Sequence, residues 1–347
     1  MRKLAFVAVL ALFLLSQQPA LAAQVGQVRN FGPDLSGSCN LPEGIASDGD
    51  RVYASSLNFG ASSGPANICV LDRRGRIVDL ISVAPASTGG VARLLGMLFV
   101  PGEGLYVGDV GGGRVLRVDV RTHAATTIAT GFGAPNAFAR DRAGNLWVSD
   151  SFPGTISRIA PSGTKTVFPY PTQLMPLAGE SPPFGANGLA FDLDERFLYV
   201  AMTARDQVFR IAYNAGSLGA ISLFAQGAAG GALDGADGIA FDIRGNLYVC
   251  SNQSDEVAVL SPAGAVIAEY RGTGANAFSS PASLVFRGRQ VFVSDLALFH
   301  GGAGQKLSTF KALSRGAPIA PSARGGDDDR NDDEQGDDDN NNDDNGD

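Results

Sequence analysis

The chain has 347 residues and a formal net charge of −8. Twelve acids and one arginine lie from Asp327 onward, a local charge of −11, so the rest of the chain is close to neutral. A near-neutral body with an acidic end lacks the basic surface that nucleic-acid binding requires, which argues against nucleic acid as a partner.

Residues 1–22 have the composition of a secretory signal peptide. Arg2 and Lys3 precede an apolar run from Leu4 to Leu15, and small residues indicate cleavage near Ala22. The alternative is a lone membrane anchor, but a span needs roughly 20 apolar residues and this run is shorter. We therefore expect a secreted or periplasmic protein that has no membrane association after signal cleavage.

Strands dominate the rest of the chain, which repeats one pattern six times. Each copy has a short apolar strand, a turn often containing Asp and Gly, a second strand, a polar loop and then amphipathic strands. The copies begin at Glu43, Leu95, Asn136, Asn187, Asp237 and Ala282. Their separations of 52, 41, 51, 50 and 45 residues are close to the roughly 40 to 50 residues of a propeller blade. The sequence thus predicts an all-β, six-bladed β-propeller over residues 23–315.

The three cysteines, Cys39, Cys69 and Cys250, lie in a chain bound for an oxidising compartment. A bridge between Cys39 and Cys69 would tie the first segment to the first copy and leave Cys250 as a buried free thiol. The cysteine spacing matches no zinc pattern, and two histidines are too few for a His-rich metal site.

The sixth copy is one strand short, because "SRGAPIAPSARGG" follows its third strand. We expect residues 24–31 to supply the missing outer strand beside residues 306–312 and to close the ring, which protects the last sheet edge. Residues 316–347 form an Asp- and Asn-rich tail that cannot bury apolar surface and is expected to be disordered. Such a tail solubilises the protein or attracts cations.

The six starting residues, here called the ring residues, are candidates for a metal site. The first strand of each blade lines the central channel of a propeller, so these residues should surround one mouth of that channel. Glu43, Asn136, Asn187 and Asp237 would bring two carboxylates and two amides together, a set of oxygen ligands that suits Ca²⁺. The alternative is that Asn and Asp only begin turns, but four such residues in register favour the metal.

The stretches "PEGIA", "APNAFA", "ANGLAF" and "ADGIAF" resemble the family of SMP-30, gluconolactonase and luciferin-regenerating enzyme, six-bladed propellers with a calcium ion in the channel. The resemblance runs from about Cys39 to Leu313, and diisopropyl fluorophosphatase and paraoxonase are more distant relatives. It implies the same four calcium ligands in the first, third, fourth and fifth blades. The sixth copy, "PASLVF", supplies no histidine, and the first lacks the Trp that often follows the Glu in sugar lactonases. Phosphotriesterase chemistry is therefore doubtful, and a sugar lactone is only one candidate substrate.

Two functions follow. The first is an exported, calcium-dependent hydrolase, most simply a lactonase or esterase for a small lactone or ester at the channel mouth, with Asp237 as catalytic base and calcium ligand. Asn136, Arg205 and His300 are the predicted substrate-binding residues. Arg205 and His300 belong to a larger candidate set in the loops after the second strands: Asp109, Asp150, Arg205, Asn252, Asp295 and His300. The second function is a non-catalytic propeller of the NHL-repeat type, a binding or scaffold module in the cell envelope.

Overall fold

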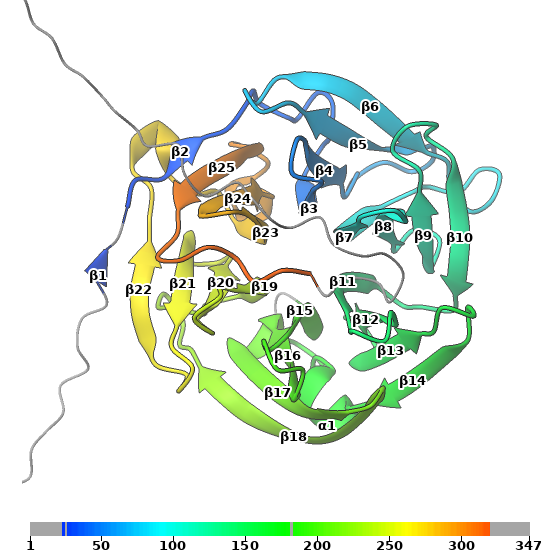
Figure 1. Ribbon diagram of the computed structural model, residues 1–347. Coiled ribbons are helices and arrows are strands. Elements are labelled where there is room, and N and C mark those ends of the chain that lie inside the picture. The colour runs from blue at the N-terminus through cyan, green and yellow to red at the C-terminus, as the bar shows by residue number, and fades with distance from the viewer. Residues whose placement is uncertain (1–22, 25, 181–182, 320–347) are drawn as a thin grey trace, which may run out of the picture.

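The computed structural model describes residues 23–24, 26–180 and 183–319. Within these residues, six antiparallel sheets are arranged radially as blades around a central channel (Figure 1). The innermost strands contact one another in a closed cycle, because the strand of the sixth blade packs on that of the first. The predicted six-bladed propeller is confirmed. The predicted signal peptide and the acidic run from Asp327 lie outside the described residues.

The strands of each blade follow chain order from the channel outward. The first blade contains β3 (Pro42–Ser47), β4 (Val52–Ser56), β5 (Ala66–Leu71) and β6 (Ile77–Val83). The second contains β7 (Leu94–Val100), β8 (Gly104–Asp109), β9 (Arg114–Val118) and β10 (Ala125–Thr130). The third contains β11 (Pro135–Arg140), β12 (Leu146–Asp150), β13 (Thr155–Ile159) and β14 (Lys165–Pro169), followed by the short helix α1 (Pro171–Leu174).

The second half of the ring has the same order. The fourth blade contains β15 (Ala186–Phe191), β16 (Phe197–Met202), β17 (Gln207–Asn214) and β18 (Ser217–Gln226). The fifth contains β19 (Ala236–Phe241), β20 (Leu247–Ser251), β21 (Glu256–Leu260) and β22 (Val266–Tyr270). The sixth contains β23 (Pro281–Arg287), β24 (Gln290–Asp295) and β25 (Lys306–Lys311). In the described part of the chain, three 3₁₀ turns lie in connections: η1 (Thr203–Arg205), η2 (Gly274–Asn276) and η3 (Leu298–His300).

An N-terminal strand completes the sixth blade, as predicted. In β2 (Arg29–Asn30), Arg29 lies opposite Thr309 and Asn30 opposite Ser308 of β25, in antiparallel pairing. The strand is shorter than the predicted residues 24–31. The two residues of β1 (Ala23–Gln24) run parallel to β22 of the fifth blade instead, and Gly26 lies between the two strands with a φ of 74°. This positive φ lets the chain turn from one blade to the next.

The hydrophobic core is divided among the interfaces between blades. One cluster joins the first and second blades through Tyr53 and Leu105, and equivalent clusters join each further pair of neighbours. Each blade therefore buries both faces against its neighbours, as propeller blades do. In the cluster between the sixth and first blades, the disulfide between Cys39 and Cys69 confirms the expected pairing, and Cys250 is buried and free.

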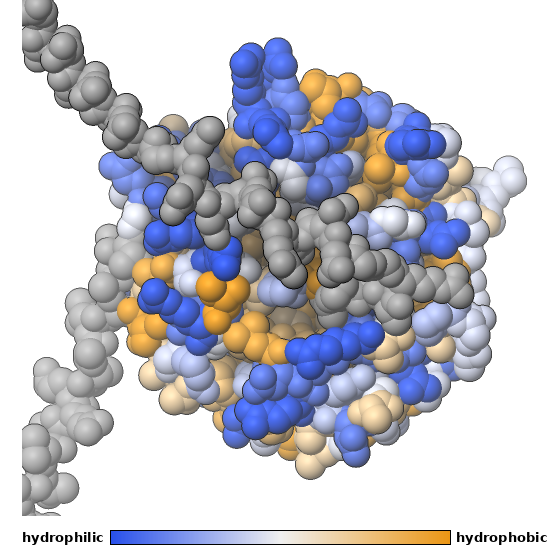
Figure 2. Space-filling view, in the orientation of Figure 1, coloured by the Kyte–Doolittle hydropathy of each residue, from blue (hydrophilic) through white to orange (hydrophobic). Residues whose placement is uncertain are grey.

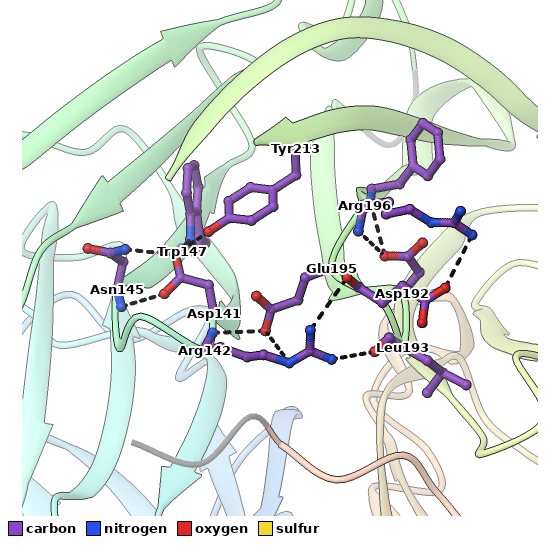
Figure 3. Close-up of polar contacts among 11 residues, drawn as sticks. Asp141, Arg142, Asn145, Trp147, Asp192, Leu193, Glu195, Arg196 and Tyr213 are labelled. Carbon is purple, nitrogen blue, oxygen red and sulfur yellow. Dashed lines mark hydrogen bonds and ion pairs between the residues drawn. The ribbon is translucent and has the colours of Figure 1, made fainter. Parts of the chain in front are cut away.

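The turn after β11 shows how polar groups join two blades (Figure 3). The Asp141 carboxylate accepts hydrogen bonds from the Asn145 backbone at 2.8 Å, from Trp147 Nε1 at 2.9 Å and from the Tyr213 hydroxyl of the fourth blade at 2.9 Å. The Arg142 backbone N–H donates to Glu195 Oε1 of the fourth blade at 2.8 Å. Trp147 is fully buried and packs in the core between these two blades.

The segment after β25 crosses the channel mouth that faces the viewer in Figure 1. Gly316 pairs with Asp242, and the Ala317 N–H donates to the Phe241 carbonyl at 2.9 Å. Residues 316–319, which we assigned to the tail, thus lie against the propeller. They close part of a cavity of about 300 Å³ lined by the second halves of the innermost strands. Around this mouth, hydrophilic side chains are interspersed with smaller hydrophobic areas (Figure 2).

Among the described helices, none is both long and apolar enough to cross a membrane.

Candidate functional site

The ring residues surround the opposite mouth of the channel, and each is the second residue of its innermost strand. The sequence pattern alone places them directly before these strands. The difference arises because the pairing with the second strand shifts register at or beside the ring residue in all six blades, for example between Pro42 and Ile45 and between Ala236 and Ile239. Such bulges bend a strand and re-aim a side chain, and here they affect every ring residue.

Adjacent innermost strands approach so closely at this level that the next residue must be small. A Cβ atom on Gly44 would lie 2.4 Å from the Leu95 carbonyl oxygen, and one on Gly188 would lie 2.2 Å from that of Asp237. The Ser294 hydroxyl of the sixth blade donates to the Glu43 carbonyl oxygen. Ring residues of neighbouring blades are therefore adjacent in space.

The four predicted ligands, Glu43, Asn136, Asn187 and Asp237, are each only 3–4% exposed. The Asn252 side chain donates to Asp237 Oδ2 at 2.8 Å. Among the described residues, Asp237 Oδ1 and Glu43 Oε2 are buried and have no hydrogen-bond partner. Burying carboxylate oxygens without partners costs free energy, so binding of a cation or of hydrogen-bond donors would stabilise this site.

The electrostatics point the same way. Burial raises the pKa of Glu43 well above its usual value, and the negative charge of Asp237 raises it further. Burial raises the pKa of Asp237 to about 7, although hydrogen bonds from Asn252 and Asn187 lower it. The two carboxyl groups thus interact directly across the channel, and a cation between them would favour the ionised form of both.

Hydroxyl groups hold the two amides. Asn136 Nδ2 donates to Ser151 Oγ at 3.2 Å, and Asn187 Nδ2 donates to Thr203 Oγ1 at 2.9 Å. These hydroxyls in turn donate to the backbone carbonyls immediately before Asn187 and Asp237, at 2.7 and 2.8 Å. Because each amide donates through nitrogen, its oxygen remains available as an acceptor or a metal ligand.

Our sequence interpretation missed Ser151 and Thr203, although a signal for them exists. The residues directly after the second strands of the six blades are Leu57, Val110, Ser151, Thr203, Asn252 and Leu296. They are polar only in the third, fourth and fifth blades, where each donates to or accepts from a ring side chain. The aligned positions after the second strands therefore identify the groups that orient the ring side chains.

The other side of the mouth is apolar. We use the name leucine cluster for the buried residues Leu41, Leu57, Leu95, Ala134, Ala282 and Leu296, against which the half-buried Val110 and Leu298 pack. Two of its members, Leu95 and Ala282, are ring residues themselves. The mouth is therefore divided. Polar side chains come from the third to fifth blades and, through Glu43, from the first, whereas the leucine cluster comes from the first, second and sixth blades and, through Ala134, from the segment before the third.

Three of the loop carboxylates accept hydrogen bonds from backbone N–H groups. Asp109 accepts the Arg93 backbone N–H at 3.1 Å and pairs with Arg114 at 2.8 Å. Asp150 accepts the Gly133 N–H at 2.9 Å, and Asp295 accepts the Ser279 N–H at 3.0 Å. Each holds the segment that leads into an innermost strand, so these contacts support a structural role.

Arg205 and His300 have partners away from the ring. Arg205 Nε lies 3.1 Å from Glu180 Oε1, and its Nη2 donates to the Met175 carbonyl at 2.6 Å. His300 Nε2 lies 2.9 Å from Asp255 Oδ2. Their contact with substrate stays a prediction, and the described contacts do not bring either side chain to the four ring ligands.

The donor set fits a calcium ion. It combines two buried carboxylates that lack partners with two amides whose nitrogens are engaged elsewhere, and Ca²⁺ takes such oxygen ligands. In the described part of the chain, no three His, Cys, Asp or Glu side chains gather as metal ligands. The amides are therefore essential to this set.

One family model matches part of the chain. The SMP-30/Gluconolactonase/LRE-like region family matches residues 181–292. No curated protein matches the chain in sequence.

Solved structures share the fold at low identity. A luciferin-regenerating enzyme is 13% identical with a TM-score of 0.65, over 86% of this chain and 99% of that one. A Xanthomonas campestris gluconolactonase is 17% identical with a TM-score of 0.58, over 84% and 96%. Regucalcin from Agrobacterium tumefaciens, described as a calcium-binding protein, is 16% identical with a TM-score of 0.59, over 85% and 98%. Residues 181–292 thus match the SMP-30/Gluconolactonase/LRE-like region, and the chain as a whole shares the six-bladed propeller fold of these solved structures.

Proposed function

We propose that the protein is an exported, calcium-dependent hydrolase that acts on a lactone or ester at the ring. The observation that carries this proposal is the pair of buried carboxylates, Glu43 and Asp237, which raise each other's need for a cation. The family match and the likeness to a gluconolactonase and to a calcium-binding regucalcin support it.

Glu43, Asn136, Asn187 and Asp237 would hold the ion. When bound, calcium supplies positive charge that stabilises the oxyanion formed on the substrate carbonyl. Asn252 fixes Asp237 through Oδ2, which leaves Oδ1 free to accept a proton from water. The hydroxide oxygen then bonds to the carbonyl carbon, the acyl carbon–oxygen bond breaks, and the proton passes from Asp237 to the alkoxide that leaves.

The alternative is a non-catalytic propeller in which calcium has only a structural role. One observation favours it, namely that each of the four ring ligands is only 3–4% exposed. In that case the protein would act as a binding module in the cell envelope, as NHL-type propellers do.

Export rests on the signal-like residues 1–22 and stays part of the proposal. The cysteine pair agrees with it, since disulfides persist in oxidising compartments.

The test is calcium-dependent turnover of a panel of lactones and esters by the purified mature protein. We expect turnover with calcium, none after chelation, and loss of activity in Asp237→Asn. The control is Asp194→Asn, which removes a charge from an exposed turn and should behave as wild type. If calcium binds tightly at the ring but no member of the panel is hydrolysed, the non-catalytic alternative replaces the hydrolase.

A further inference from the structure

We propose that the substrate carries an apolar, aliphatic group next to its lactone or ester carbonyl, and that the leucine cluster receives this group. The inference rests on the proposed function and names the substrate class of the same site. It concerns the apolar side of the mouth, whose residues have no role in the proposed mechanism.

The first observation is that two aligned sets of positions divide the mouth in the same way. Among the ring residues, the third to fifth blades supply Asn136, Asn187 and Asp237, whereas the second and sixth supply Leu95 and Ala282. At the positions after the second strands, the third to fifth blades supply hydrogen-bonding groups, and the first, second and sixth supply aliphatic ones. From the first to the sixth blade, the residues at these positions are Leu57, Val110, Ser151, Thr203, Asn252 and Leu296.

The second observation is that the apolar half is continuous. Leu41, Leu57, Leu95 and Leu296 come from three blades and belong to one contacting cluster. A Cβ atom on Gly44 would lie 2.4 Å from the Leu95 carbonyl oxygen, so the strand that carries Leu95 lies directly beside the strand that carries Glu43. A substrate whose carbonyl lies at Asp237 would therefore have the leucine cluster across the mouth.

This division decides between substrate classes. A hydroxyl group placed against leucine side chains gives up its hydrogen bonds to water and gains none, so a polyhydroxylated lactone would be bound poorly. An alkyl chain in the same place removes apolar surface from water, and each buried methylene should strengthen binding about fourfold. The arrangement therefore fits an alkyl-substituted lactone or a fatty ester better than a sugar lactone.

The half-buried members of the cluster mark its accessible edge. Val110 and Leu298 are more exposed than the leucines they contact, and Phe299, next to Leu298, is 44% exposed. An incoming alkyl group would meet these residues first.

The experiment measures kcat/KM for γ-lactones with alkyl chains of increasing length and for glucono-δ-lactone. Val110→Thr keeps the side-chain shape and adds a hydroxyl group at the edge of the cluster. The matched control is Val78→Thr in β6, a residue that is 48% exposed far from the channel. We expect kcat/KM to rise by about fourfold per methylene, and we expect Val110→Thr, but not Val78→Thr, to lower it at least threefold for the long-chain lactones alone.

Preference for glucono-δ-lactone, or indifference to chain length, would overturn the inference and leave the proposed hydrolase standing. If no lactone is turned over, the proposed function fails, and calorimetric titration with 5-alkyl pyrrolidinones and a polyhydroxylated lactam decides the inference by binding alone. Tighter binding of the alkyl compound, weakened by Val110→Thr, supports the apolar site. Equal or weaker binding of the alkyl compound contradicts it.

Discussion

Replacing Asp237 by Asn should stabilise the calcium-free protein at alkaline pH while it destroys the calcium response. The carboxylate is buried, and its pKa is raised from 3.8 to about 7 in the folded chain. A raised pKa in the folded state means that the protonated form is favoured there. The stabilising contribution of this group is therefore fully present below about pH 4 and is lost as the pH rises through about 7.

The size of the effect follows from that shift. A shift of about three pKa units, at about 1.4 kcal/mol each, corresponds to an upper limit of about 4 kcal/mol. An amide of the same shape avoids this cost because it has no charge. Without calcium at pH 8, Asp237→Asn should thus have a higher free energy of unfolding than wild type, by as much as about 4 kcal/mol. Near pH 4 the two proteins should be almost equal.

Urea unfolding in chelator, at intervals between pH 4 and pH 8, measures the difference. Asp295 and Glu256, whose pKa values burial raises to about 7, contribute equally to both proteins and cancel. Calcium at a hundredfold excess over its dissociation constant should then stabilise wild type by about 2.7 kcal/mol and the variant far less. Asp194→Asn should follow wild type throughout. If calcium-free Asp237→Asn is no more stable than wild type at pH 8, the carboxylate is not held in the costly environment described above.

Three further predictions concern groups around the ring. Thr203→Val removes the hydroxyl that orients the Asn187 amide and should weaken calcium binding about tenfold or more in a calorimetric titration. The control is Thr126→Val at an exposed position, and equal calcium affinities of Thr203→Val and wild type would contradict the orienting role. Deletion of Asp327–Asp347 should leave the high-affinity calcium site and any turnover intact in the same titration, since loss of that site would place it in the tail. Gly188→Ala, whose Cβ would lie 2.2 Å from a carbonyl oxygen, should unfold or strongly destabilise the protein in a thermal melt followed by circular dichroism, whereas Gly37→Ala, with open space around it, should not.

The repeat explains why the fold could be predicted. Six copies of one pattern place equivalent residues at equivalent positions, so ring closure and the level of Glu43 and Asp237 in the channel follow from alignment alone. The disulfide between Cys39 and Cys69 could be expected because Cys250 is the only other cysteine and falls inside a buried strand.

Contacts that depend on the path of a loop could not be predicted in this way. Arg205 has a long side chain, and its partner Glu180 lies in the connection before β15, whose course no repeat specifies. The shortened closing strand depends on a single turn at Gly26. Ser151 and Thr203 were missed for another reason, since small hydroxyl residues are common in loops and only their alignment one residue beyond the second strands distinguishes them.

The central claim is that the ring binds a calcium ion, and a crystal structure grown with calcium tests it most directly. We predict an anomalous-scattering peak on the channel axis, with Glu43, Asn136, Asn187 and Asp237 as its protein ligands, and we predict its disappearance in Asp237→Asn crystals. No peak at the ring in saturating calcium, or an unchanged peak in the variant, would contradict the account.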